Sequence, residues 1–341
     1  MRNVIILITD ITVETQIILN YMIISRTPFR ISFAGGGTDF REFYREEGGA
    51  VVSTTIDKYV YLSINPLFNN KGYHLKYFYN EICKDIEQIK HPIIKEVFER
   101  YHISGVDFNS TTDVPSGTGL GSSSSFTVGL VNLCKNYCDM TVFRDYIAEE
   151  ASEFEIDILK SPIGKQDQYA ATFGGLNFIR FKPDESVDVY PIILSKDKLK
   201  ELESSLVLFY LGGTRSSDSV LTEQKNNILS NRGTLKKMAL LTVDLANELN
   251  NDTINNFGDI LNAGWRYKKE LSSNVSNGDI DYWYNEAMKH GAKGGKLLGA
   301  GNGGFLLLYA PNGGADILRA SLRLYELNFK FENTGTKIIY Q

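Results

Sequence analysis

A stretch rich in glycine and serine, residues 115–125, has the composition of a phosphate-binding loop. It reads Pro-Ser-Gly-Thr-Gly-Leu-Gly-Ser-Ser-Ser-Ser and runs directly into FTVGLVNLCKNYC, an apolar segment that fits a helix. The N-terminus of a helix offers unpaired N–H groups and the positive end of the helix dipole, which favour phosphate. Glycines let the backbone approach a ligand, and serine hydroxyls can donate hydrogen bonds or bind magnesium. A flexible linker is the alternative, but a linker would not lead straight into an apolar helix.

Two further glycine clusters lie at residues 35–37 and 299–304, far from the first in sequence. The cluster at 299–304 contains a literal G-x-G-x-x-G, formed by Gly299, Gly301 and Gly304. A dinucleotide site needs this pattern between a strand and a helix, whereas here the strand-like FLLLYA follows it. No Walker A pattern occurs in the chain. The glycine clusters therefore indicate a phosphate site that is neither a dinucleotide-binding loop nor a Walker A loop.

Composition excludes several other classes of protein. The chain has 341 residues, enough for about two domains. A net charge of −5 argues against nucleic acid or an anionic membrane as the main partner. The four histidines show no ligand spacing, which disfavours a histidine metal site or a Ser-His-Asp triad. The three cysteines, Cys83, Cys134 and Cys138, do not form a disulfide framework and are expected to be core thiols.

The N-terminal residues 1–21 are expected to lie outside the working fold. They are apolar only in patches, and Met22 stands directly before a strong strand pattern. No run reaches the ~18 apolar residues of a membrane helix. The segment has one basic residue and no small-residue cleavage site, so it is a poor signal peptide. A cytoplasmic location is therefore expected.

Hydrophobic patterns divide the rest of the chain into runs of strands with helices clustered after them, which favours an α+β fold. Thr38 or Asp39 is expected to cap a short helix, residues 160–168 to be a loop, and the charged residues 195–205 to be a loop at a domain boundary. We therefore expect an N-terminal domain over 22–197 and a C-terminal domain over 198–341. Strands are predicted at 23–34, 50–68, 74–79, 106–115, 176–181, 187–194, 204–213 and 305–310 and near the C-terminal FENTGTKIIY, and helices at 91–102, 126–138, 142–159, 281–291, 313–326 and most of 219–262.

Three ordered motifs resemble those of the GHMP small-molecule kinases, a superfamily that includes galactokinase, homoserine kinase and mevalonate kinase. They are RTPFRISFAGGGTDF (26–40), DVPSGTGLGSSSS (113–125) and KLLGAGNGGF (296–305). The resemblance extends from residue 22 to the C-terminus. It implies a two-domain fold, with an N-terminal domain like domain 2 of ribosomal protein S5 and a ferredoxin-like C-terminal domain. It also implies ATP as donor and Mg²⁺ as cofactor.

Within this superfamily, GGGTD and the later SPIGKQDQYAATFGG are similar to the sugar-1-kinases that act on D-glycero-D-manno-heptose 7-phosphate. The resemblance implies phosphorylation of the anomeric hydroxyl to give the 1,7-bisphosphate, in nucleotide-activated heptose biosynthesis. L-fucose-type kinases share GGGTD and are the alternative substrate class. A non-catalytic sugar-phosphate sensor is the alternative of another class. The expected partners are a sugar phosphate and ATP, with no nucleic acid or membrane; a homodimer stays open.

The resemblance assigns the catalytic role to Asp167, which matches the aspartate that takes the proton of the acceptor hydroxyl. A simple helix cap is the alternative role for this residue. Arg30 resembles the motif-one arginine near the catalytic centre. Lys165 precedes Asp167 by two residues, and alternate positions on an extended loop point the same way, so we expect the two side chains to pair.

The same resemblance assigns magnesium to Ser123 and Glu155, with Glu153 and Asp157 as competitors for the second position. Magnesium suits such a site because it binds a few protein oxygens together with phosphate and water. The residues expected to bind ATP come from the glycine- and serine-rich motif: Pro115, Gly117, Gly119, Leu120, Gly121, Ser122, Ser123 and Ser124.

Substrate binding is expected from the first and third motifs. Asp39 matches the aspartate that accepts hydrogen bonds from sugar hydroxyls, and Arg215 is the candidate clamp for the 7-phosphate. A plain surface arginine is the alternative reading of Arg215. The remaining residues expected to contact substrate are Gly36, Gly37, Thr38, Gly301 and Gly303.

Overall fold

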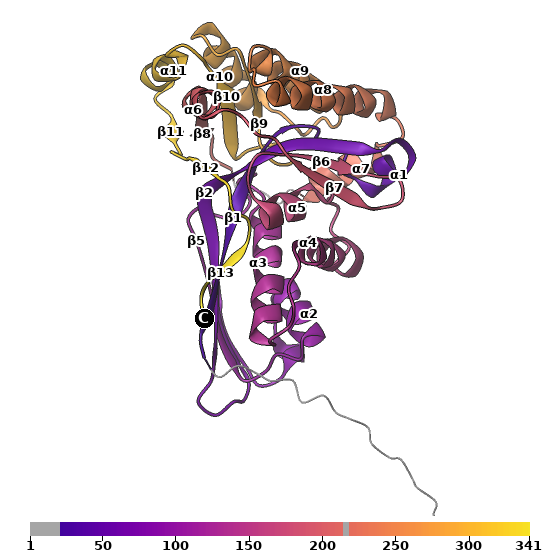
Figure 1. Ribbon diagram of the computed structural model, residues 1–341, viewed down its shortest axis with the longest axis vertical. Helices are drawn as coiled ribbons and strands as arrows, with labels where there is room; N and C mark the ends of the chain where they lie inside the picture. The colour runs from indigo at the N-terminus through magenta and orange to yellow at the C-terminus, as the bar shows by residue number, and fades with distance from the viewer. Residues whose placement is uncertain (1–20, 214–217) are drawn as a thin grey trace, which may run out of the picture.

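The computed structural model describes residues 21–213 and 218–341 and contains two β-sheets with helices packed on them (Figure 1). Its strands are β1 (Ile23–Ala34), β2 (Gly49–Pro66), β3 (Tyr73–Lys76), β4 (Asn80–Cys83), β5 (Val106–Thr112), β6 (Asn177–Phe181), β7 (Val187–Pro191), β8 (Leu206–Tyr210), β9 (Gly294–Leu297), β10 (Phe305–Tyr309), β11 (Tyr325–Glu326), β12 (Phe331–Glu332) and β13 (Lys337–Tyr340). Its helices are α1 (Arg41–Glu47), η1 (Ile86–Gln88), α2 (Pro92–Arg100), α3 (Ser122–Tyr137), α4 (Arg144–Ser152), η2 (Glu153–Ile158), α5 (Gln166–Phe173), α6 (Lys196–Ser204), α7 (Asp218–Asn226), α8 (Arg232–Asn250), α9 (Phe257–Glu270), α10 (Gly278–Lys289) and α11 (Gly314–Leu322).

The larger sheet is organised around β2, an 18-residue strand that pairs with β1, β5, β6 and β12. Its β-branched and aromatic residues suit a long strand whose first eight residues are all buried. The last two strands of the chain return to this sheet, since Phe331 of β12 faces Ile56 of β2 and Ile338 of β13 faces Ser25 of β1. Strands β12 and β13 thus complete the larger sheet, although their residues belong to the C-terminal domain expected over 198–341.

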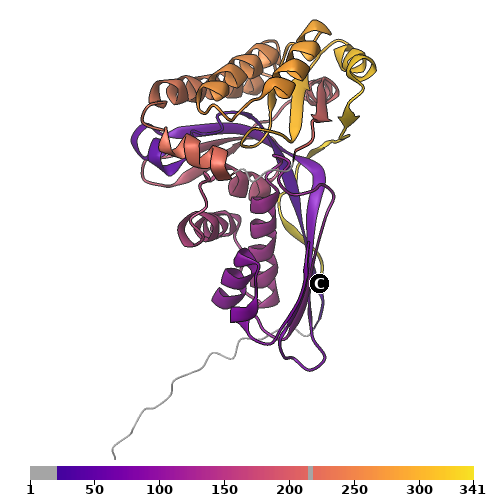
Figure 2. The ribbon, with the colours of Figure 1, turned by 180° about the vertical axis from the view of Figure 1, so that it is seen from behind.

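Helix α3 packs against β1 and β2, beside α2 and α4 on the same face of the sheet (Figures 1 and 2). Gly129 permits this close packing, because a Cβ atom there would lie 2.7 Å from Oγ1 of Thr27. The Ser25 hydroxyl donates a 3.1 Å hydrogen bond to the carbonyl oxygen of Gly129. These contacts hold the middle of α3 against the first half of β1. Both elements also carry residues of the candidate site.

The smaller sheet has the order β11-β8-β10-β9, and all its pairings are antiparallel. Helices α8 to α11 lie at the same end of the molecule as the smaller sheet (Figure 2). Trp265 of α9 is fully buried in an apolar cluster with Phe209 of β8 and Leu306 of β10. Strand β10 directly follows the glycine cluster at 299–304. The strand expected there is confirmed, and it excludes a dinucleotide site at this cluster.

Several sequence expectations are wrong in detail. Residues 195–205 form helix α6, because Ser195 caps it through the N–H of Lys198 and Leu202 is buried. The expected loop at 160–168 ends early, since α5 begins at Gln166. Strands β4, β9 and β11 were not expected, and the helix expected over 313–326 ends at Leu322, before β11. Neither Thr38 nor Asp39 caps α1, whose N-cap is Phe40.

The remaining expectations concern the termini and bulk properties. Residues 1–20, most of the expected N-terminal extension, lie outside the described part of the chain. Across 21–213 and 218–341, no helix has the length and apolarity to cross a bilayer. The three cysteines are free and buried, as expected for core thiols.

Candidate active site

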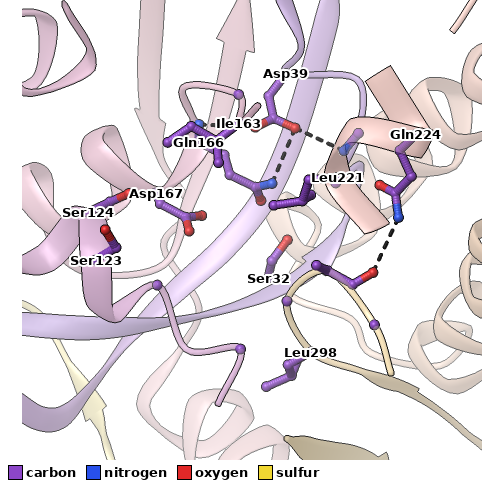
Figure 3. A pocket seen from close by; sticks show the side chains of 18 of the residues that line it. Ser32, Asp39, Ser123, Ser124, Ile163, Gln166, Asp167, Leu221, Gln224 and Leu298 are labelled. Carbon is purple, nitrogen blue, oxygen red and sulfur yellow. Dashed lines mark hydrogen bonds between the residues drawn. The ribbon is translucent and has the colours of Figure 1, made fainter. Parts of the chain in front are cut away.

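All three glycine clusters line one cavity of about 230 Å³, shown from close by in Figure 3. The wall also includes residues of α3, η2, α5 and α9. Asp167 lies beside Ser123 and Ser124 in this view, with Gln166 and Asp39 on its other side (Figure 3). The fold therefore assembles the three sequence motifs into a single candidate site.

A paired arginine and aspartate lie in the wall of this cavity. Arg30 donates from Nε to Oδ1 of Asp167 at 2.7 Å and from Nη2 to Oδ2 at 2.6 Å. Its third nitrogen, Nη1, donates to the carbonyl oxygen of Gly119 at 2.6 Å. Bidentate pairing fixes the plane of the carboxylate. The Arg30 side chain is 6 % exposed and that of Asp167 20 %, so the aspartate keeps access to the cavity.

Asp39 is buried, and its carboxylate is held by main-chain and amide donors. It accepts hydrogen bonds from the N–H of Gly37 at 2.9 Å, the N–H of Gln166 at 3.2 Å and Nε2 of Gln166 at 3.2 Å. Burial raises the pKa of Asp39, with the nearby charge of Asp167 adding to the effect. Gly164 is required here, because a Cβ atom there would lie 2.1 Å from Oδ2 of Asp39.

Glu155 is presented by η2, a π-helix that interrupts the helix expected over 142–159. Its Oε1 accepts from the Ser123 hydroxyl at 2.9 Å, and its Oε2 accepts from Nε2 of Gln168 at 2.6 Å. Burial raises the pKa of Glu155 to about 7. The competitors point elsewhere: Glu153 pairs with Arg100 and Asp157 with Arg41. Of these three acidic residues, Glu155 lines the cavity.

The Ser123 and Glu155 oxygens fit magnesium by the chemistry of their donors. Both are hard oxygen atoms of the kind that Mg²⁺ takes from proteins alongside phosphate and water. Burial disfavours the ionised form of the Glu155 carboxylate, and a bound dication would supply the positive charge that stabilises it.

The phosphate-binding motif reaches the cavity through Gly117, Gly119, Gly121 and the serines at 122–124. Gly121 is the N-cap of α3 with φ of 75°, a conformation that favours glycine. Two residues expected to bind ATP are not in the cavity wall. Leu120 is fully buried with its carbonyl oxygen accepting from the N–H of Arg30, and Pro115 is exposed.

The third motif packs directly on the second. A Cβ atom on Gly299 would lie 2.5 Å from the Cα of Gly119, and one on Gly304 would lie 2.4 Å from the carbonyl oxygen of Thr118. Gly301 and Gly303 line the cavity, as do Gly36 and Gly37 of the first motif. The glycines of the third motif therefore permit two backbones to meet at the cavity wall.

The structure contradicts the expected surroundings of two other residues. Lys165 does not pair with Asp167: its Nζ lies 3.5 Å from Oε2 of Glu185, because residues two apart at a helix start point in nearly opposite directions. Thr38 is fully buried, and its hydroxyl bonds to the backbone of Gly35 and Ala50. Arg215 lies outside the described residues.

Sequence reasoning missed several polar residues of the wall. Gln166 holds Asp39, Gln168 holds Glu155, and Lys268 and Lys296 are buried at the cavity. The sequence could have pointed to Lys296 as a site residue, since it is the one charged residue in KLLGAGNGGF. Lys268 had none, because a lysine in a helix is ordinarily solvated.

Comparison with known proteins shows the family of this chain. The family model of the GHMP kinases N terminal domain matches residues 87–175. The chain is 31 % identical over 333 residues to the D-glycero-alpha-D-manno-heptose 7-phosphate kinase of Campylobacter jejuni, covering 92 % of this chain and 97 % of that protein. The chain belongs to the GHMP kinases. It is accordingly a carbohydrate kinase, a phosphotransferase with an alcohol group as acceptor.

Solved structures share the fold. A crystal structure of a D-glycero-D-manno-heptose 1-phosphate kinase from Bacteroides thetaiotaomicron matches with a TM-score of 0.76 and 25 % identity, covering 94 % of this chain and all of that one. Lactococcus lactis galactokinase, solved with galactose, shares the fold at a TM-score of 0.69 and 16 % identity over 93 % of this chain and 95 % of that one. The α+β kinase fold expected from the motifs is confirmed.

Proposed function

We propose that this sugar kinase transfers the γ-phosphoryl group of ATP to the anomeric hydroxyl of D-glycero-D-manno-heptose 7-phosphate, giving the 1,7-bisphosphate. The observation that carries the proposal is the position of Asp167. It lies in one cavity with the serines at the start of α3 and with Asp39. A base between a phosphate-binding helix terminus and a hydroxyl-binding carboxylate is the arrangement that phosphoryl transfer to a sugar requires.

The donor and the acceptor enter from different walls of the cavity. The N-terminus of α3 and the serines at 122–124 bind the phosphates of ATP. Asp39 accepts hydrogen bonds from adjacent sugar hydroxyls. Ser123 and Glu155 would hold Mg²⁺, which neutralises charge on the β- and γ-phosphates when bound. Each group of the proposed reaction thus has a named binding position.

The chemical step uses Asp167 as base. The anomeric oxygen forms a bond to the γ-phosphorus, the bond from that phosphorus to the β,γ-bridging oxygen breaks, and ADP leaves. The hydroxyl proton passes to Asp167, whose carboxylate Arg30 holds in place by two hydrogen bonds. Arg30 also adds positive charge beside the reacting group. The proton then returns to solvent when the product leaves.

The choice of acceptor rests on the relatives. The Campylobacter jejuni protein is a heptose 7-phosphate kinase by name, while the Bacteroides structure is described as a heptose 1-phosphate kinase. L-fucose is the second candidate, because an Arabidopsis thaliana bifunctional fucokinase is 26 % identical over 84 % of this chain. That match spans 29 % of the bifunctional protein.

A coupled assay of ADP release tests the proposal with heptose 7-phosphate, unphosphorylated heptose, fucose, galactose and mevalonate as acceptors. We expect turnover on heptose 7-phosphate, and a new phosphorus resonance coupled to the anomeric proton. Turnover on fucose alone would refute the proposed acceptor. A phosphate appearing on any other carbon would refute the position of transfer.

A further inference from the structure

Two buried lysines in the cavity wall have no role in the step described above. Lys268 comes from α9 and Lys296 from β9, and each residue is 7 % exposed. Both line the cavity that contains Asp39 and Asp167. Lysine is rarely buried without a charged partner, so two of them at one cavity call for an explanation.

Within the part of the chain that the structure describes, the hydrogen bonds of these lysines go to backbone carbonyls. Nζ of Lys268 donates to the carbonyl oxygens of Gly299 and, at 3.4 Å, Leu297. Nζ of Lys296 donates to the carbonyl oxygen of Phe33 at 3.3 Å. Within residues 21–213 and 218–341, neither forms an ion pair with a carboxylate. The carbonyls orient the two ammonium groups, and the charges of Asp39 and Asp167 act on Lys268 without a direct ion pair.

A third buried lysine shows what a structural role looks like in this protein. Lys165 is also buried, but its Nζ lies 3.5 Å from a carboxylate oxygen of Glu185. Burying an ammonium group without a counterion is costly. A protein that needed Lys268 and Lys296 only for packing would gain by replacing them with apolar residues. Their retention at a cavity indicates that the missing counterion is a ligand.

Three cations lie in this part of the wall, beside the carboxylates of Asp39 and Asp167. Arg30 is the third cation, and its charge is matched by Asp167. Burial lowers the pKa of Lys268 to about 8, with the charge of Arg30 adding to the effect and those of Asp167 and Asp39 opposing it. Burial also lowers the pKa of Lys296 well below its ordinary value, with the charges of Lys268 and Arg30 adding to the effect. An anion at this position would relieve the burial cost of both ammonium groups.

We propose that Lys268 and Lys296 form a subsite for a phosphate monoester carried by the acceptor sugar. This inference rests on the proposed function and assigns the group that recognises the phosphorylated substrate. The phosphates of ATP have their own site at the start of α3. Lys296 instead bonds to Phe33 at the end of β1, the strand that leads into the Gly36–Asp39 segment. Lys296 therefore lies on the acceptor side of the cavity, and Lys268 lies near enough to Asp39 and Asp167 for their charges to act on it.

Titration calorimetry of three variants tests the subsite. Lys268→Gln and Lys296→Gln remove one charge each, and Lys269→Gln is the control, because Lys269 is the next residue of α9 but is exposed and pairs with Asp281. The probes are heptose 7-phosphate, unphosphorylated heptose and the ATP analogue AMP-PNP, each titrated alone. Losing one charged hydrogen bond should weaken binding of heptose 7-phosphate about tenfold or more. Binding of heptose and AMP-PNP should change less than about twofold, and the control should match the wild type.

A measurement on the wild type covers the case in which a variant does not fold. Inorganic phosphate should compete with heptose 7-phosphate for binding and leave the affinity for unphosphorylated heptose unchanged. Weaker binding of AMP-PNP with unchanged binding of heptose 7-phosphate would assign the lysines to the nucleotide and overturn the subsite. Equal losses for heptose with and without phosphate would overturn it as well.

Turnover separates this inference from the proposed function. A wild-type enzyme that phosphorylates heptose 7-phosphate, with lysine variants that bind it normally, would overturn the subsite alone. A wild-type enzyme that phosphorylates only a different sugar phosphate, with variants that lose it, would overturn the proposed acceptor and support the subsite. A wild-type enzyme that phosphorylates only unphosphorylated sugars would overturn both.

Discussion

Arg30 and Asp167, 137 residues apart in sequence, form a two-point ion pair with distances of 2.7 and 2.6 Å. The same guanidinium donates to the carbonyl oxygen of Gly119, and the N–H of Arg30 donates to that of Leu120. One side chain on β1 thus fixes both the carboxylate at the start of α5 and the loop before α3. The orientation of the base and the shape of the phosphate loop therefore depend on one residue.

Asp167→Asn should lower kcat by about 10²- to 10⁴-fold, the usual contribution of a general base. The amide keeps the shape of the carboxylate but cannot take a proton. Binding of AMP-PNP, measured by calorimetry, should stay within about twofold of the wild type. Arg30→Lys should also reduce kcat, because an ammonium group cannot hold the carboxylate at two points. Full activity in Asp167→Asn would show that the carboxylate is not the base.

Glu155→Gln should abolish activation by Mg²⁺ and also change how stability depends on pH. Burial raises the pKa of Glu155 from 4.5 to about 7. The folded state therefore holds this proton more tightly than the unfolded state, so folding stability falls as pH rises from 4.5 to 7. The cost above pH 7 is on the order of 3 kcal/mol. Without metal, the variant should melt at a higher temperature than the wild type at pH 8 and at a similar temperature at pH 4.5.

The local contacts favour this substitution. Oε1 of Gln168 is buried without a hydrogen-bond partner, so it can accept from the amide of a glutamine at position 155. Adding Mg²⁺ should raise the melting temperature of the wild type more at pH 8 than at pH 5, because the metal needs the ionised carboxylate. Equal pH profiles for the two proteins would contradict the shifted pKa of Glu155.

The sequence was informative where chemistry depends on local motifs. The glycines and serines of 117–124 could be predicted as a ligand-binding loop because a loop that leads into a helix leaves a local signal. Asp167 was assigned through the resemblance to the GHMP kinases, and the structure places it in the same cavity as this loop. Lys268 could not, because its burial depends on how α9 packs against β9. The inward position of Glu155 depends on the π-turn at 153–158, whose extra residue per turn no hydrophobic pattern reported. The expected partnership of Lys165 and Asp167 assumed an extended backbone where the chain is helical.

Lys165 and Glu185 should therefore behave as a structural pair. Lys165→Gln should lower stability by about 1 kcal/mol, because the pair is partly buried. Glu185→Gln should lower it more, because Glu185 also pairs with Arg41 and Arg45. Adding Lys165→Gln to Glu185→Gln should cost little further. Urea unfolding of the four proteins measures this coupling. Catalytic activity should fall far less than in Asp167→Asn. A loss of kcat in Lys165→Gln as large as that of Asp167→Asn would restore the lysine to the catalytic group.

Gly304→Ala should separate the second and third motifs. The added Cβ would lie 2.4 Å from the carbonyl oxygen of Thr118, and Gly304 has a φ of 98°, which strains any other residue. The backbone of residues 117–121 would have to move away from that of 299–304. Together, strain and clash should destabilise the protein by about 1–3 kcal/mol and weaken ATP binding.

Gly264→Ala is the matched control for that substitution. Gly264 lies in α9, where a Cβ meets nothing within 4 Å, so alanine should stabilise the protein slightly and leave activity unchanged. Thermal melts and KM for ATP compare the two variants. Glycine at 304 is then required by contact between two backbones, whereas glycine at 264 is not. Normal melting and a normal KM for ATP in Gly304→Ala would show that the two motifs move freely relative to each other, and that their contact does not shape the nucleotide site.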